Sequence, residues 1–296
     1  MQPFIRRRLG HSRPKQYCSF TGRRTMLEHT VDRAAAAVGA ERVVTVANVD
    51  HRQFMESPRR LELPGRLIFQ PRRCDTGPGV FLPLAAVMAR DPEAVVAVMP
   101  SDHFIHSGER FQTILDEAFR LAEFLPGQIV LLAAAPDGPE GDYGWIAPGK
   151  RISEGGAFLA GGFREKPKPE DAEDFFRRGW LWNTMIIVAR AAALWNHAQD
   201  LRPEMMARFQ ALRGWIGLPD EQEAIELAYR GMPNVNLSRD LLEPLADWTV
   251  ALPMTGIQWS DWGRPERVER TLTKIGKRSA LSAAFPAGTA LAPAAA

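Results

Sequence analysis

The sequence predicts an α/β fold with a mixed, mostly parallel central sheet flanked by helices. Short apolar runs alternate with amphipathic stretches, as expected for βαβ units. Two runs, at 94–99 and 129–134, are apolar without alternation, which is typical of strands that are buried on both faces. A chain of 296 residues is long enough to bury a sizeable core around such a sheet.

The first half of the chain is expected to alternate helices and strands regularly. Residues 24–38 predict a helix because their apolar side chains recur near helical spacing. A second helix is expected at 79–90 in spite of Pro83, and Asp91-Pro92 would end it. The other elements expected here are strands at 42–48, 66–70, 94–99 and 129–134, and a helix at 111–124.

The second half is less regular because glycine and proline interrupt it often. The residues at 170–178 predict a helix with acids in its first turn, bases in its last, and Gly179 just beyond. Other expected helices lie at 191–211, interrupted at Pro203, and at 221–229; strands are expected at 142–148, 157–165, 183–190 and 248–259. Residues 278–296, rich in Ala and Pro, are expected to form a disordered tail after one domain at 1–277.

The composition excludes several classes of protein. With 37 basic and 35 acidic side chains, the formal charge of +2 gives no global field for nucleic acid or membrane. Basic residues are concentrated in the first 24 positions. They could form either a solvated basic face or an anion site for phosphates. Two cysteines are too few for a disulfide framework, and no apolar run approaches a membrane span or a signal peptide core. We expect a cytoplasmic protein.

Two aspartates that follow strand-like runs are candidate metal ligands. Asp102 follows the run at 94–99, and Asp261 follows the run at 248–259. Ligands of open α/β sheets bind at the carboxyl ends of strands, and Mg²⁺ is usually held there by one or two carboxylates plus substrate phosphates. The alternatives are a helix-capping or turn aspartate for Asp102, and packing around a turn for Asp261.

Two short segments carry side chains suited to phosphates and sugars. Lys166 can neutralise a phosphate, while Glu165 can accept hydrogen bonds from sugar hydroxyls. Lys15, in the segment Pro14-Lys15-Gln16, can meet a phosphate in the same way. An ion pair on the surface is the ordinary alternative for such isolated residues, so each signal is weak when it is taken alone.

The order of these segments along the chain is more specific. The sequence contains PKQY, RTMLEHT, QP with DTGP, PSDH, DYGWI, FREKP, WNT and WSDWG, in this order between residues 14 and 263. Together they resemble the motifs PKQ, SMLQxTxxR, EPxxRNTAP, PADH, GYGYI, FVEKP, WNSG and WSDVGSW of bacterial mannose-1-phosphate guanylyltransferases. Those enzymes are sugar-nucleotide pyrophosphorylases, and the resemblance extends to about residue 277.

The resemblance implies a Rossmann-like nucleotidyltransferase core and a Mg²⁺-dependent reaction. The sugar 1-phosphate would attack the α-phosphorus of a nucleoside triphosphate, releasing pyrophosphate and leaving an NDP-sugar. Catalysis would rest on positioning and charge neutralisation, without a covalent enzyme intermediate. GTP and mannose 1-phosphate are the default substrates, and GDP-mannose is the default product.

The resemblance also implies a role for each matched residue. Asp102 and Asp261 would hold Mg²⁺, Lys15 the triphosphate and Lys166 the sugar phosphate. Gly144, Glu165 and Asn183 would contact the hexose, Thr76 and Pro78 the base, and Arg6 the nucleotide. The sequence does not fix the sugar, the base or the oligomeric state, and a homodimer is the assembly considered.

The chain departs from the family pattern at its beginning. Residues 1–6 resemble only the end of the family's glycine-rich phosphate loop, so we expect roughly 10–20 residues of strand and loop to be missing. A misassigned start codon is the simplest explanation. The alternative is a non-catalytic homologue that binds a nucleotide or nucleotide-sugar as a regulatory or partner subunit. Cys74 also replaces an arginine of the family motif, which weakens any reading of base choice.

A nucleic-acid-binding role for the basic N-terminal stretch is a third hypothesis, and the sequence does not favour it. The net charge is nearly neutral, and few aromatic residues lie among the arginines.

Overall fold

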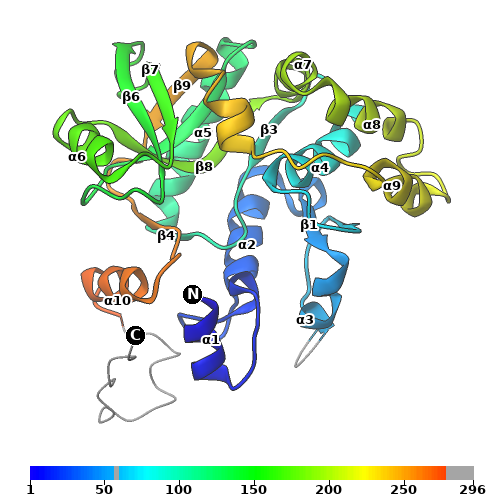
Figure 1. Ribbon diagram of the computed structural model, residues 1–296, viewed down its shortest axis with the longest axis horizontal. Helices are drawn as coiled ribbons and strands as arrows, with labels where there is room; N and C mark the ends of the chain where they lie inside the picture. The colour runs from blue at the N-terminus through cyan, green and yellow to red at the C-terminus, as the bar shows by residue number, and fades with distance from the viewer. Residues whose placement is uncertain (57–59, 278–296) are drawn as a thin grey trace.

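The computed structural model describes residues 1–56 and 60–277 (Figure 1). The tail predicted at 278–296 lies outside the described residues. The predicted α/β class is confirmed: a central sheet is covered by helices on both faces. No helix in the described part of the chain combines the length and apolar character needed to cross a membrane.

The central sheet has six strands in the order β3-β8-β5-β9-β7-β6. In chain order these strands are β3 (Val95–Val98), β5 (Ile129–Ala134), β6 (Gly144–Arg151), β7 (Phe158–Glu165), β8 (Leu181–Arg190) and β9 (Thr249–Pro253). The first five match predicted strands to within a few residues, and β9 covers the first part of the strand expected at 248–259. β3 is the exception in burial: it was expected to be buried on both faces, but all its residues are partly exposed because it is an edge strand of this sheet.

The sheet is mixed, as predicted, but most of its pairings are antiparallel. Only β5 and β9 pair in parallel within it. The chain leaves β5, forms the antiparallel β6–β7 hairpin, and returns as β8 between β3 and β5, running against both. The expectation of a mostly parallel sheet was therefore wrong, because the excursion between β5 and β8 inverts the returning strand.

Two small sheets complete the β structure. β1 (Val44–Asn48) pairs in parallel with β2 (Arg66–Gln70), both close to their predicted positions. β4 (Phe104–His106) pairs antiparallel with β10 (Gln258–Ser260). β4 was not predicted. The single strand expected at 248–259 is in fact β9 and β10, which belong to different sheets.

Most helices lie where the sequence predicted them. These are α2 (Met26–Val38), α4 (Thr76–Arg90), α5 (Gly108–Phe124), α6 (Pro169–Arg177), α7 (Ala191–Leu201), α8 (Pro203–Arg213) and α9 (Glu221–Tyr229). The break expected at Pro203 separates α7 from α8. Three helices were not predicted: α1 (Gln2–Leu9), α3 (Arg52–Glu56) and α10 (Pro265–Lys274).

The core is divided by the central sheet. Alternate side chains of β5 enter two different clusters, as the pleat of a strand requires: Ile129, Leu131 and Ala133 on one face, and Val130, Leu132 and Ala134 on the other. The first cluster includes α4, α7 and α8, and the second includes α5. A third cluster packs α1 against α10 (Figure 1).

Candidate active site

The β4–β10 ribbon brings the two predicted metal acids together. Phe104 lies opposite Ser260 in this antiparallel pair. Asp102 comes two residues before Phe104, and Asp261 comes directly after Ser260. Both aspartates therefore lie at the same end of the ribbon, although they are far apart in the sequence.

Lys15 lies between the two acids. Its Nζ is 3.1 Å from Asp102 Oδ2, and it also donates to the backbone carbonyl of Asp261. The side chain of Lys15 is only 12% exposed, whereas that of Asp102 is 37% exposed. The 3₁₀ turn at Lys15–Tyr17 thus supplies a cation at the point where the carboxylates converge. The structure brings these three predicted site residues together, and their roles remain predictions.

One oxygen of Asp261 accepts three hydrogen bonds. The donors to Oδ1 are the hydroxyl of Tyr143 at 2.6 Å, the backbone N–H of Gly263 at 3.0 Å and Nη1 of Arg267 at 3.0 Å. Burial alone would raise the pKa of Asp261, but these hydrogen bonds and the Arg267 charge hold it below its ordinary value. The other oxygen, Oδ2, has no hydrogen-bond donor among the described residues, so an ionised carboxylate presents one free oxygen.

Arg267 was missed by sequence reasoning, yet it organises this part of the site. The side chain is nearly buried, and its Nη2 lies 2.8 Å from Glu140 and 2.9 Å from Asp142. Its guanidinium stacks over the ring of Tyr143 at 4.4 Å. Because α10 is mostly polar, the sequence does not indicate that one of its arginines contacts Asp261.

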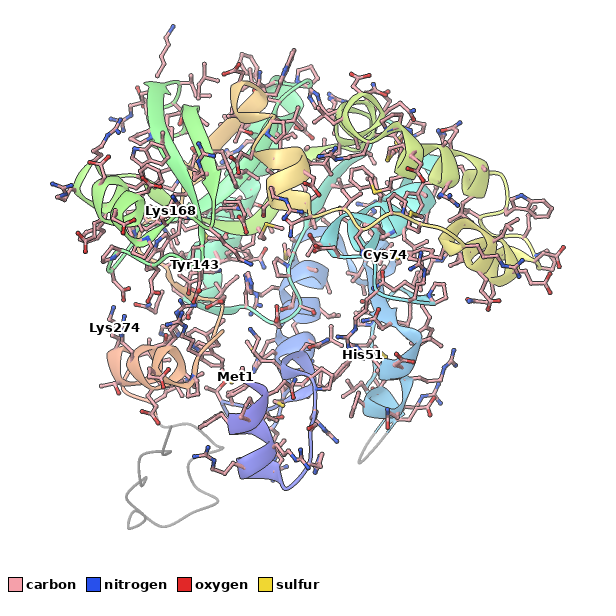
Figure 2. The ribbon with its side chains drawn as sticks, in the orientation of Figure 1. Met1, His51, Cys74, Tyr143, Lys168 and Lys274 are labelled. Atoms are coloured by element: carbon pink, nitrogen blue, oxygen red, sulfur yellow. The ribbon has the colours of Figure 1, made fainter. Side chains whose placement is uncertain are left out.

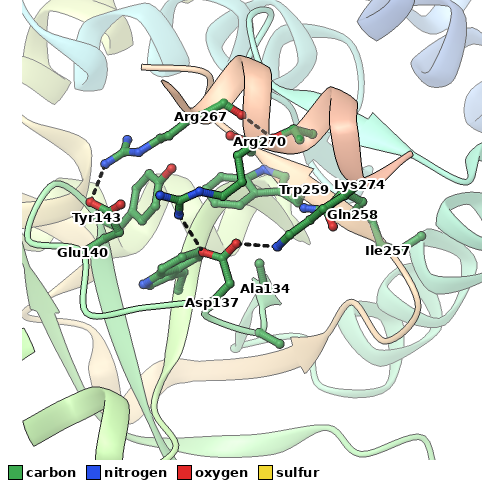
Figure 3. A pocket seen from close by; sticks show the side chains of 14 residues that line it. Ala134, Asp137, Glu140, Tyr143, Ile257, Gln258, Trp259, Arg267, Arg270 and Lys274 are labelled. Carbon is green, nitrogen blue, oxygen red and sulfur yellow. Dashed lines mark hydrogen bonds and ion pairs between the residues drawn. The ribbon is translucent and has the colours of Figure 1, made fainter. Parts of the chain in front are cut away.

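Figure 3 shows the cavity beside this network, between α10 and the segment that follows β5. The cavity has a volume of about 220 Å³. Its charged side chains are already paired with one another: Arg267 with Glu140, and both Arg270 and Lys274 with Asp137. These pairs tie α10 to the chain just before β6, and so hold Arg267 in place against Asp261.

The acid pair suits Mg²⁺ bound together with a substrate. Among the described residues, no group of three or more His, Cys, Asp or Glu side chains forms a metal-binding cluster. Mg²⁺ does not need one, because it is commonly held by one or two carboxylates while phosphates and water complete its octahedron. Asp102 and Asp261, with the free Oδ2 of the latter, fit that donor set.

The three residues predicted to contact a hexose also come together. Gly144 begins β6 and pairs with Glu165 at the end of β7. A Cβ added at Gly144 would lie 2.7 Å from Glu165 Oε2 and 3.2 Å from Asn183 Cβ. Asn183 is buried, and its Oδ1 accepts a hydrogen bond from the backbone N–H of Met185 at 3.0 Å. The absence of a side chain at Gly144 leaves room between Glu165 and Asn183.

Glu165 and Lys166 lie where the predicted strand ends. Burial raises the pKa of Glu165 above its ordinary value, and the neighbouring Lys166 charge offsets only part of this rise. Lys166 adopts a left-handed conformation with φ 45°, and its backbone N–H donates to the carbonyl of Tyr143 at 3.2 Å. Its exposed side chain has no hydrogen-bond or ion-pair partner in the described part of the chain, so it is free to meet a ligand.

The remaining predicted residues are not connected to the acid pair by any hydrogen bond or ion pair between described residues. Thr76 Oγ1 accepts a hydrogen bond from the backbone N–H of Leu237, and the carbonyl of Pro78 accepts one from the hydroxyl of Tyr229. Arg6 is exposed on α1. Figure 2 shows Cys74, just before this segment, to the right of Tyr143 in the central part of the molecule. The roles of Thr76, Pro78 and Arg6 remain predictions.

Comparison with known proteins identifies the family of this chain. A family model described as nucleotidyl transferase matches residues 7–276. The chain belongs to the nucleotidyl transferase family. This confirms the resemblance found in the sequence.

Several of the curated relatives are mannose-1-phosphate guanylyltransferases by name. The chain is 27% identical over 256 residues to mannose-1-phosphate guanylyltransferase RfbM of Salmonella typhimurium, covering 84% of this chain and 52% of the relative. It is 25% identical over 283 residues to an Escherichia coli mannose-1-phosphate guanylyltransferase, covering 91% and 57%. The chain thus spans about half the length of the curated relatives it matches.

A solved structure supports the fold. The chain is similar to a mannose-1-phosphate geranyltransferase from Thermus thermophilus, with a TM-score of 0.76 and 25% sequence identity. The match covers 88% of this chain and 73% of the other.

Proposed function

We propose that this protein transfers a nucleotidyl group from a nucleoside triphosphate to a sugar 1-phosphate, forming an NDP-sugar and pyrophosphate. The observation that carries the proposal is the convergence of Asp102, Asp261 and Lys15 at one end of the β4–β10 ribbon. The names of the relatives support GTP and mannose 1-phosphate as the substrates and GDP-mannose as the product. We also propose a cytoplasmic location. Cys18 and Cys74 are free thiols, which is compatible with a reducing compartment.

The reaction is a displacement at phosphorus. A phosphate oxygen of the sugar 1-phosphate forms a bond to the α-phosphorus, and the bond from the α-phosphorus to the bridging oxygen of pyrophosphate breaks. Asp102 and Asp261 would hold Mg²⁺, which when bound supplies positive charge to the phosphate oxygens. Lys15 would contribute a second positive charge beside the triphosphate, and Lys166 would neutralise the attacking sugar phosphate. Such a mechanism depends on positioning and charge.

The sugar would lie against Gly144. The backbone at this position can approach a ring closely because no Cβ intervenes, while Glu165 and Asn183 offer oxygen and nitrogen atoms to its hydroxyls. Thr76 and Pro78, at the start of α4, would lie beside the nucleotide base. Arg6 would reach the nucleotide from α1.

The direct test is pyrophosphate release from defined substrate pairs. The protein is incubated with Mg²⁺, each common nucleoside triphosphate and each of several hexose 1-phosphates, and the NDP-sugar is identified by mass spectrometry. We expect the largest kcat/KM for GTP with mannose 1-phosphate. A larger kcat/KM for another pair would refute the assigned specificity, and the absence of turnover with every pair would refute the enzymatic proposal.

One observation favours a second candidate function, that of a non-catalytic binding subunit. Lys15 already neutralises Asp102 and contacts Asp261, so the protein could bind a nucleotide-sugar beside these acids without any metal. In that case GDP-mannose would bind equally well with and without Mg²⁺, and no substrate pair would release pyrophosphate. Calorimetry in Mg²⁺ and in EDTA separates the two candidates.

A further inference from the structure

A second, basic cavity lies between α2, β4 and the turn that follows β10. It has a volume of about 120 Å³. Its more buried wall is formed by His29, Arg33, His103 and Trp262, while Arg24 and Lys277 lie exposed at its rim. None of the residues that line it is an aspartate or a glutamate.

Arg33 is a half-buried cation without a carboxylate partner among the described residues. Its Nη2 donates to the hydroxyl of Thr30 at 2.8 Å and, at 3.4 Å, to the carbonyl of His103. The adjacent Asp32 is instead paired with Arg24 at 2.6 Å. Burial lowers the pKa of Arg33 to about 10, and the charge of Asp32 offsets this only in part. A charge withdrawn from solvent is costly unless an opposite charge compensates it, so the site lacks an anion.

Four nitrogen atoms of this wall have no hydrogen-bond partner among the described residues. They are Nε2 of His29, Nε of Arg33, Nδ1 of His103 and Nε1 of Trp262. Each of these atoms is shielded from solvent, and Trp262 is only 1% exposed. Buried polar atoms are normally satisfied, so these four nitrogens leave unmade hydrogen bonds in the wall of the cavity. An oxyanion offers several acceptor oxygens at once.

We propose that this cavity binds a small oxyanion of the phosphate class. A cavity of about 120 Å³ has room for a phosphate group. The site adjoins the candidate active site, because His103 follows Asp102 and Trp262 follows Asp261. The phosphate group would therefore come either from leaving pyrophosphate or from free inorganic phosphate acting as an effector. The existence of the site does not depend on the proposed function.

The test measures binding of inorganic phosphate and of pyrophosphate by calorimetry, and the rise in melting temperature with each anion against chloride at equal ionic strength. A ligand that binds only the folded state raises the melting temperature. We expect saturable binding to the unmodified protein and at least about a tenfold weaker affinity in Arg33→Met, equivalent to about 1.4 kcal/mol. His29→Phe is the second variant, in case Arg33→Met does not fold.

One variant serves as a control. Arg178→Met removes an exposed arginine just after α6, which is assigned to no phosphate, and should bind phosphate like the unmodified protein. Failure of the proposed function would leave this result unchanged, since no turnover is measured. The absence of saturable binding, or equal binding by the Arg33 and His29 variants, would overturn the site.

Competition with GTP identifies the source of the anion. If GTP and Mg²⁺ displace bound phosphate, and pyrophosphate binds in the same cavity, the site receives the leaving group. If phosphate and GTP bind simultaneously, the site is a separate effector site. Both results support an oxyanion site, and both require the affinity to depend on Arg33.

Discussion

Tyr143 is one of three donors that fix the orientation of Asp261. Its hydroxyl lies 2.6 Å from Oδ1 of that aspartate. Replacing it by phenylalanine removes a hydrogen bond to a charged group, which contributes about 1.5–3 kcal/mol. We expect Tyr143→Phe to lower kcat/KM by roughly 10- to 100-fold while the protein remains folded. Thr113→Ala, which removes an exposed hydroxyl of α5, should leave kcat/KM unchanged.

Gly144 is a second position where a single atom, an added Cβ, is expected to change sugar binding. An alanine there would place its Cβ 2.7 Å from Glu165 Oε2, closer than real Cβ contacts allow. We expect Gly144→Ala to displace Glu165 and weaken sugar 1-phosphate binding by about tenfold or more, equivalent to about 1.4 kcal/mol. In Gly162→Ala, on the neighbouring strand, the nearest atom would lie at an ordinary 3.8 Å. Equal sugar affinity in the two variants would contradict the predicted pocket.

Glu165 should make stability depend on pH. Its pKa is raised in the folded state, so the folded protein holds a proton more tightly than the unfolded chain. Stability from this group is complete below the unfolded pKa, near 4.5, and is lost as the pH rises through the folded pKa. Glu165→Gln should therefore gain melting temperature relative to the unmodified protein at pH 7 but not at pH 4. The same difference at both pH values would show that burial does not penalise this carboxylate.

At the scale of elements, α2 depends on a capping box. Thr25 Oγ1 accepts from the backbone N–H of Glu28, whose carboxylate accepts in return from the backbone N–H of Thr25. Removing such a cap costs about 1 kcal/mol, within a range of roughly 0.5–2 kcal/mol. Chemical denaturation of Thr25→Ala should show this loss, whereas Thr273→Ala, exposed in α10, should change the unfolding free energy little. An unaltered stability of Thr25→Ala would mean that tertiary packing alone holds α2.

The elements show what sequence patterns can and cannot predict. Hydrophobic periodicity and proline placement located β2, α8 and α9 at or close to their observed bounds. The ribbon of β4 and β10 was missed because three-residue strands are too short to show a period. The orientation of β8 was also wrong, since a local pattern does not encode which neighbours a strand will pair with.

The candidate site, too, could be predicted from the sequence only in part. Family motifs found Lys15, Asp102 and Asp261, and the structure brings them together. Arg267 escaped because its contacts with Asp261, Glu140 and Asp142 depend on where α10 docks. Nothing in the sequence around Arg267 distinguishes it from Arg270, the half-exposed arginine of the same helix.

At the scale of the whole molecule, segments far apart in the chain build a single charge pattern. Lys15 comes from the N-terminal region, Asp102 follows β3, and Asp261 follows β10. Only the complete fold aligns them, so unfolding any of these segments would take apart the proposed metal site. Metal binding at this proposed site would therefore report on the assembled molecule more directly than any single contact does.

The most direct test of this account is the affinity for Mn²⁺, a paramagnetic substitute for Mg²⁺, measured by electron paramagnetic resonance in the presence of GTP. We predict a single site in the unmodified protein, weakened by at least about tenfold in Asp102→Asn and in Asp261→Asn, which is equivalent to about 1.4 kcal/mol. Circular dichroism would confirm that both variants are folded. Unchanged Mn²⁺ affinity in the two folded variants would contradict the central claim that these aspartates form the metal site.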